Sequence, residues 1–77
     1  MQDTIWCYLK LVYLQIEWIV EVSKEMKVDD LIELLHHQFS SEPKGMYFYE
    51  ATTSRLIDGN QTFEQNQIES GNYLYFI

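Results

Sequence analysis

The sequence predicts a single α+β domain in which a mixed sheet of four to five strands packs on one helix. Two early segments have the two-residue period of strands, the next has the 3.6-residue period of a helix, and short apolar segments follow. The chain has 77 residues, of which 47% are hydrophobic, so residues 1–77 are expected to bury one core and form one domain. A domain with so small a core is not expected to form a deep enzyme cleft.

The first two predicted strands form a hairpin. In residues 5–12 and 16–22, side chains alternate between the two faces of an extended chain. The turn around residues 13–15 contains no Gly, Asn or Asp, the residues that favour short hairpin turns, so the sequence leaves the pairing register open. The predicted core side of the first strand carries Ile5, Cys7, Leu9 and Leu11.

A helix follows the hairpin, because five apolar residues recur at helical spacing and form one stripe. Asp29 and Asp30 lie in its first turn, where the helix dipole favours acidic groups. His36 and His37 lie near its end, where the dipole favours them when protonated. No capping side chain precedes the stripe, and helix-breaking residues occupy 40–45. The stripe consists of Val28, Leu31, Ile32, Leu35 and Phe39.

Three shorter segments complete the predicted order. Residues 46–50 form a third strand, residues 56–57 a short apolar piece, and residues 73–77 the last strand. The residues Asp58-Gly59-Asn60 mark a turn between the second and third of these segments. One helix then covers one face of a mixed sheet.

The segment from residue 56 to residue 68 resembles a pattern of the ubiquitin family. That pattern is a leucine, an acidic residue with Asp-Gly, then Thr-Leu, then Asn-Ile, and this chain has one extra residue before the threonine. With the hairpin and the start of the helix at Val28 and Leu31, the resemblance covers nearly the whole chain. It implies a ubiquitin-like β-grasp fold, in which strands from each half of the sequence form one sheet around the helix.

The resemblance to the ubiquitin family also bears on chemistry. Conjugating members carry a flexible tail that ends in Gly-Gly, since only glycine lets the backbone approach so closely in the site of an activating enzyme. Residues 73–77 of this chain read Tyr-Leu-Tyr-Phe-Ile instead. We therefore expect a protein that is neither conjugated nor catalytic.

Among non-conjugating relatives, the sequence resembles the YukD/EsaB family of WXG100 (type VII) secretion systems. The resemblance lies in chain length, in residues 28–32 at the start of the helix, and in residues 68–74 near the end. It implies an adaptor with a protein partner, for which a membrane secretion component is one candidate. Two alternatives stay open: a modifier or sulfur-carrier type of protein without its Gly-Gly tail, and a small packing subunit of a multicomponent enzyme.

Charge and apolar runs exclude several partner classes. Twelve acidic and five basic residues give a formal net charge of -7, which repels nucleic acid and anionic lipid headgroups. Apolar runs such as residues 11–14 are far shorter than the roughly 20 residues of a membrane helix. We expect a cytoplasmic protein with no nucleic-acid partner and no direct membrane insertion.

The sequence suggests no catalytic, cofactor or metal site. His36 and His37 are adjacent on the helix and face different directions, so a solvated helix end is expected. Cys7 alternates with core residues and is expected to act as a small buried hydrophobe. The acidic residues Asp58, Glu64 and Glu69 show no paired arrangement and are expected at a solvated rim.

The resemblance to the ubiquitin family implies that Leu74 and Phe76 point into the core, and strand alternation then predicts an aromatic outer face of the sheet, opposite the helix. Contiguous exposed apolar area on a monomer usually marks an interaction surface, and we predict a protein-interaction site here. Two other interpretations stay open: the tyrosines only stabilise the sheet through cross-strand pairs, or the face forms a homodimer. The predicted site consists of Trp6, Tyr8, Ile19, Tyr47, Tyr49, Tyr73, Tyr75 and Ile77.

Overall fold

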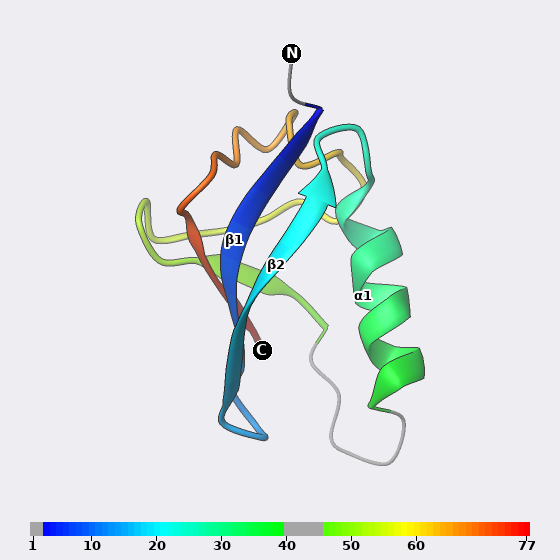
Figure 1. The fold of residues 1–77 in the computed structure, drawn as a ribbon, viewed down its shortest axis with the longest axis vertical. Coiled ribbons are helices and arrows are strands. Elements are labelled where there is room, and N and C mark those ends of the chain that lie inside the picture. Colours follow the sequence, from blue (N-terminus) through cyan, green and yellow to red (C-terminus); the bar gives the residue numbers. More distant parts are fainter. Residues whose placement is uncertain (1–2, 40–45) are drawn as a thin grey trace.

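The computed structural model describes residues 3–39 and 46–77, which form five strands and one helix (Figure 1). The strand order in the sheet is β2-β1-β5-β3-β4. Strands β1 and β5 pair in parallel, and the other neighbours are antiparallel. This is the predicted α+β architecture, with the first and last strands side by side at the centre. The elements are β1 (Thr4–Leu11), β2 (Ile16–Ser23), α1 (Val28–Gln38), β3 (Phe48–Glu50), β4 (Arg55–Leu56) and β5 (Tyr73–Phe76).

One core lies between the helix and one face of the sheet. The helix contributes Val28, Leu31 and Leu35 to it, as the predicted stripe requires. Ile32 and Phe39 of that stripe pack against the core from its margin. Helix α1 lies alongside the hairpin of β1 and β2 (Figure 1). The sheet and loops contribute Ile5, Cys7, Leu9, Leu11, Val22, Phe48, Ile57, Phe63, Ile68, Leu74 and Phe76.

The structure supplies the hairpin register that the sequence left open. Leu11 pairs with Ile16, so a four-residue turn at 12–15 joins the two strands. The amide of Gln15 lies 3.4 Å from the carbonyl oxygen of Val12. Gln15 has a φ of 54°, the left-handed conformation that glycine adopts more readily. The turn therefore forms without the usual Gly or Asn at the cost of some backbone strain.

Replacing Gln15 with glycine is expected to raise the free energy of unfolding by about 1 kcal/mol, because glycine has no Cβ to strain the left-handed conformation. Urea denaturation of the variant and the parent measures the difference. Gln61 is exposed and is not among the residues with positive φ, so Gln61→Gly is the control and should not stabilise. A less stable Gln15→Gly protein would contradict the assignment of strain to this turn.

The first turn of α1 is capped by a loop rather than by a side chain. Lys27 occupies the N-cap position and makes no side-chain cap hydrogen bond. Instead, the amide of Val28 donates to the carbonyl oxygen of Gln61 at 3.0 Å. The amide of Asp29 donates to the carbonyl oxygen of Gly59 at 2.9 Å. The loop after β4 thus satisfies amides that a helix leaves free at its start.

The predicted segments after the helix occur in the predicted order, with shorter strands. The third strand begins at Phe48 rather than at residue 46, and the last strand ends at Phe76. The predicted break at 40–45 lies outside the described residues. In the part of the chain that the structure describes, no helix is long and apolar enough to cross a membrane.

Candidate protein-interaction site

The outer face of the sheet, on the side away from α1, carries the predicted interaction residues. Side chains of β1 alternate strictly, so Cys7 and Leu9 have no exposed surface while Tyr8 between them is half-buried. In β5, Leu74 and Phe76 are likewise buried in the core. Tyr73 and Tyr75 consequently point outward from the same strand, as predicted.

The register aligns outward side chains from neighbouring strands into two rows. In the first row, Tyr8 of β1 pairs with Ile19 of β2 on one side and with Tyr73 of β5 on the other. In the second row, Tyr75 of β5 pairs with Lys10 of β1 and with Tyr49 of β3. Tyr49 in turn lies opposite Leu56 of β4, so the second row continues to that edge of the sheet. Residues far apart in sequence thereby form one surface: Ile19, Tyr8, Tyr73, Lys10, Tyr75, Tyr49 and Leu56.

Five aromatic rings on this face contact one another in an unbroken series. Trp6 meets Tyr8 edge to face, with ring centroids 5.5 Å apart. Tyr8 stacks on Tyr73 at 5.4 Å, and Tyr73 meets Tyr75 edge to face at 5.2 Å. Tyr75 stacks on Tyr49 at 6.4 Å. We call these five residues the aromatic row.

The other predicted residues surround the aromatic row. Ile19 is 57% exposed at the β2 side. Tyr47 and Ile77 exchange two backbone hydrogen bonds just beyond β3 and β5, at 3.1 and 2.9 Å, and both side chains are exposed. Leu56, 59% exposed, belongs to this face and was not predicted there. Its strand has only two residues, so no alternation could reveal which way the side chain points.

Acidic groups lie along the β2 side of the face. The hydroxyl of Tyr73 donates a hydrogen bond to the carboxylate of Glu17. That hydrogen bond, followed by burial and the charge of Glu17, raises the pKa of Tyr73 to about 12. Glu21 pairs with Trp6 across the two strands, and Lys10 pairs with Glu17. The face is therefore an aromatic surface with an acidic margin along β2, and Lys10 lies between the two.

Glu50 is a buried acidic residue on the core side of β3 that no sequence pattern singled out. It is 1% exposed, and its carboxylate accepts hydrogen bonds from the amides of Thr52 and Thr53 at 2.9 and 2.8 Å. The hydroxyl of Thr53 donates a further one at 2.6 Å. Burial by itself would raise the pKa of Glu50, but these hydrogen bonds outweigh it and lower the pKa to about 2.

A second buried polar residue, Asn66, organises the loop after β4. Its amide nitrogen donates to the carbonyl oxygens of Asp58 and Thr62, both at 2.9 Å, and its amide oxygen accepts from the amide of Asp58 at 2.9 Å. Arg55 links this loop to the Glu50 group: it donates to the hydroxyl of Thr53 at 2.8 Å and to the carbonyl oxygen of Asn66. Buried polar groups that are fully hydrogen-bonded in this way position backbone. We therefore assign Glu50 and Asn66 a structural role.

The remaining candidate groups lie apart from this face. Cys7 is in the core as predicted, and burial, with the charge of Glu50, raises the pKa of its thiol to about 11. The prediction of a solvated helix end is wrong for His36, which is half-buried with its ring 5.9 Å from that of Phe76. His37 is exposed. Among the described residues, no group of three or more His, Cys, Asp or Glu side chains could hold a metal ion.

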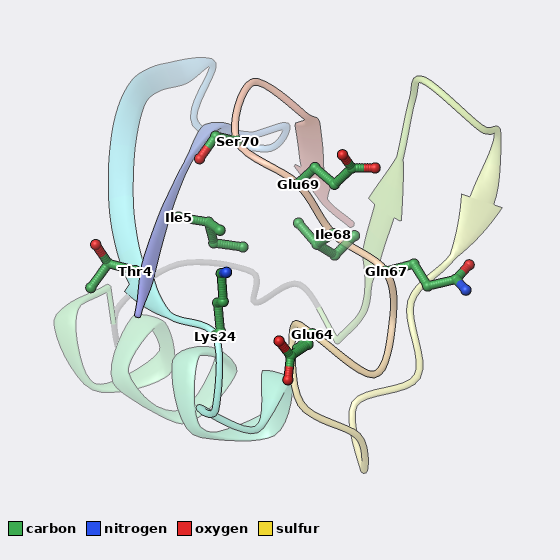
Figure 2. A pocket seen from close by; sticks show the side chains of 8 residues that line it. All are labelled: Thr4, Ile5, Lys24, Glu64, Gln67, Ile68, Glu69 and Ser70. Atoms are coloured by element: carbon green, nitrogen blue, oxygen red, sulfur yellow. The ribbon is translucent and has the colours of Figure 1, made fainter. Parts of the chain in front are cut away.

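A shallow hollow of about 380 Å³ lies between the start of β1 and the loop before β5 (Figure 2). Ile5 and Ile68 point toward each other across it, and Lys24 extends between Ile5 and Glu64. The carboxylate of Glu69 points away. This hollow presents one ammonium group and no converging set of acids, bases or nucleophiles, so it does not resemble a catalytic site.

Comparison with solved structures identifies the fold. The chain resembles a de novo designed protein based on ubiquitin, with a TM-score of 0.74 and 17% identity, over 97% of this chain and 88% of that one. It also resembles the ubiquitin-like domain of an Arabidopsis thaliana protein in a solution NMR structure, with a TM-score of 0.72 and 17% identity, over 96% of this chain and 76% of that one. A second NMR-based structure of that Arabidopsis protein gives a TM-score of 0.71 and 19% identity, over 96% of this chain and 84% of that one. Neither a family model nor a curated protein matches the sequence. At these identities the similarity establishes the ubiquitin-like β-grasp fold alone.

Proposed function

We propose that this ubiquitin-like domain is a non-catalytic adaptor that binds a protein partner through its outer aromatic face. The observation that carries the proposal is the aromatic row itself, flanked by the exposed apolar side chains of Ile19, Leu56 and Ile77. A solvated sheet face normally alternates toward polar residues, and contiguous exposed apolar area marks interaction sites. Aromatic residues are also enriched among the residues that dominate binding energy.

Electrostatics supports the same proposal. The chain has a formal net charge of -7, and Glu17 and Glu21 lie at the margin of the face. Complementary charges increase association rates and discriminate against partners of the wrong sign. The proposed partner therefore offers an apolar surface bordered by basic residues. Trp6, Tyr8, Tyr49, Tyr75 and Ile77 are proposed as the main contacts.

The more specific proposal, an accessory role in a WXG100 (type VII) secretion system, is supported by the resemblance of the sequence to the YukD/EsaB family. A cytoplasmic adaptor of this kind, without a cofactor, would bind a secretion component at the membrane through the outer aromatic face. The competing proposals of a modifier or sulfur carrier, or of a packing subunit of an enzyme, predict different partners. A single binding experiment separates them.

The experiment is an affinity pull-down from detergent-solubilised cells of the source organism, with the parent chain and a Trp6→Ala/Tyr75→Glu variant. The side chain of Trp6 is exposed and that of Tyr75 is half-buried, so the variant should still unfold cooperatively in urea. We expect a secretion component to bind the parent. Its affinity for the variant should be lower by about 100-fold or more, as when the dominant contact residues of an interface are removed. Gln61→Glu, an exposed site off the face, controls for the added charge.

Each alternative gives a different result in that experiment. A covalent ladder or an activating enzyme would support the modifier proposal and contradict the adaptor. Recovery of the other subunits of one enzyme would support the packing subunit. Equal binding by the parent and the variant would place the site elsewhere. If the variant does not fold, the aromatic row is needed for the sheet itself, at about 0.5–1.5 kcal/mol per ring pair, and Tyr49→Ser with Ile77→Ser becomes the milder test of binding.

A further inference from the structure

Strand β2 forms an edge of the sheet, and its hydrogen-bonding groups divide between two directions. The amide of Tyr8 in β1 donates to the carbonyl oxygen of Asn72 at 3.0 Å, and the amide of Val12, just after β1, donates to that of Phe76 at 3.4 Å. The backbone N–H and C=O groups of even-numbered residues of β1 therefore point toward β5. The amide of Lys24 donates to the carbonyl oxygen of Asp3 at 2.8 Å, so the backbone groups of odd-numbered residues of β1 point toward β2. Antiparallel pairs alternate in this way along the whole ladder.

The alternation leaves three residues of β2 with backbone groups that point away from the sheet. These are Glu17, Ile19 and Glu21, each opposite an even-numbered residue of β1. Ser23 follows the same alternation, but its carbonyl oxygen accepts from the amide of Met26 at 3.1 Å. Within the described residues, β2 is the outermost strand on this side and nothing pairs with the groups of the other three. Three amides and three carbonyls thus form a row at which a further strand could pair.

This edge lacks most features that natural proteins use to block pairing. Such features are short strands, proline, lysine and bulges. Strand β2 has eight residues without proline or lysine, and all eight pair with β1 in regular register. What it does carry is negative charge, because the side chains of Glu17 and Glu21 are exposed on either side of Ile19. The negative charge of these two side chains therefore determines which strands can pair with β2.

A second copy of this chain is a poor occupant of the edge. The antiparallel register that uses all three free residues places Ile19 opposite Ile19 of the second copy. It then places Glu17 opposite Glu21, and Glu21 opposite Glu17, on the same face. Like charges directly opposite each other destabilise a strand pair. A strand with lysine or arginine at those two positions would instead form favourable cross-strand pairs.

The other face of the same edge is apolar. Ile16 and Trp18 of β2, with Leu34, Leu35 and Phe39 of the helix region, line a hollow of about 450 Å³. Leu34 is exposed, and the rings of Trp18 and Phe39 lie 6.2 Å apart. Figure 1 shows β2 and α1 next to each other on this side. A strand added to β2 would direct alternate side chains into this hollow.

We propose that the β2 edge binds an extended segment of a partner protein as a sixth strand, in which basic residues alternate with apolar ones. The basic residues pair with Glu17 and Glu21, and the apolar ones enter the hollow beside Leu34. Asp30 and Glu33, which lie beside Leu34 on the helix, extend the negative surface around it. This site is distinct from the aromatic row, so it does not depend on the adaptor proposal.

The test uses a blocked eight-residue peptide of alternating lysine and valine, added to the whole ¹⁵N-labelled chain. We expect the amide hydrogens of Glu17, Ile19 and Glu21 to exchange at least about tenfold more slowly, because these amides would gain partners in the added strand. The NMR signals of the Trp18 indole N–H and of the Leu34 amide should change their chemical shifts on binding. A peptide with glutamate in place of lysine should bind at least about tenfold more weakly.

Two variants at the edge and one control on the aromatic row separate the edge from other surfaces. Glu21→Lys is expected to remove the preference for the lysine peptide, because the introduced positive charge offsets that of Glu17. Glu21 is chosen because Glu17 also accepts a hydrogen bond from Tyr73. Leu34→Asp should weaken binding of the lysine peptide, whereas Tyr75→Glu on the aromatic row should leave it unchanged. Equal binding of both peptides would overturn the proposal, as would binding without slower exchange at the three amides. So would a dimer of the free parent chain, seen by sedimentation, in which the amides of Glu17, Ile19 and Glu21 already exchange slowly.

Discussion

Replacing Asn66 with alanine is expected to lower the free energy of unfolding by about 3 kcal/mol, because the change removes three side-chain hydrogen bonds to backbone groups of Asp58 and Thr62 and takes the partner from the amide of Asp58. Asn66 makes three hydrogen bonds to these groups and is 4% exposed. The same loop caps α1 through Gly59 and Gln61, so the amides of Val28 and Asp29 should also exchange faster. Urea denaturation and amide exchange measure the two effects.

The control for Asn66 is Asn60, an exposed asparagine in the same loop. Asn60→Ala should change the free energy of unfolding by less than about 0.5 kcal/mol, as exposed substitutions usually do. If Asn66→Ala is as stable as Asn60→Ala, water or a rearranged loop replaces the lost hydrogen bonds. The assignment of Asn66 as the residue that organises the loop would then be wrong.

Replacing Glu50 with glutamine is expected to lower the free energy of unfolding by about 2 kcal/mol at neutral pH, because hydrogen bonds to a charged acceptor are stronger than those to an amide. The pH dependence should change as well. The pKa of Glu50 is about 2 in the folded protein and 4.5 in the reference state, so its contribution is complete above about pH 4.5. It is lost as the pH falls from 4.5 toward 2.

The measurement is a urea denaturation series from pH 2 to pH 7 on the parent and on Glu50→Gln. The parent should lose stability between pH 4.5 and pH 2 more steeply than the variant, which has no carboxylate at this site. Glu25→Gln, at an exposed position, should keep the profile of the parent. Parallel profiles for the parent and Glu50→Gln would show that other carboxylates cause the acid sensitivity.

Alternation along β1 and β5, with the resemblance to the ubiquitin family, predicted the residues of the outer face. In β1 and β5, the buried and outward positions follow the period of two that the sequence displays, because one side of each strand meets the core. This pattern, together with the inward orientation of Leu74 and Phe76 that the ubiquitin resemblance implied, placed the aromatic residues Trp6, Tyr8, Tyr73 and Tyr75 on one face. It could not place Leu56, because a two-residue strand has no period.

Local periodicity in the sequence was enough to predict the fold class, the order of the elements, and how the side chains of the long strands divide between two faces. The hairpin register, the capping of α1 by a distant loop, and the roles of Glu50 and Asn66 became clear from the folded chain. They depend on hydrogen bonds and on strand pairing between particular backbone and side-chain groups, and such contacts leave no periodic trace in a sequence. The free edge of β2 belongs with them, since the strand order arises only when β5 pairs with the other side of β1.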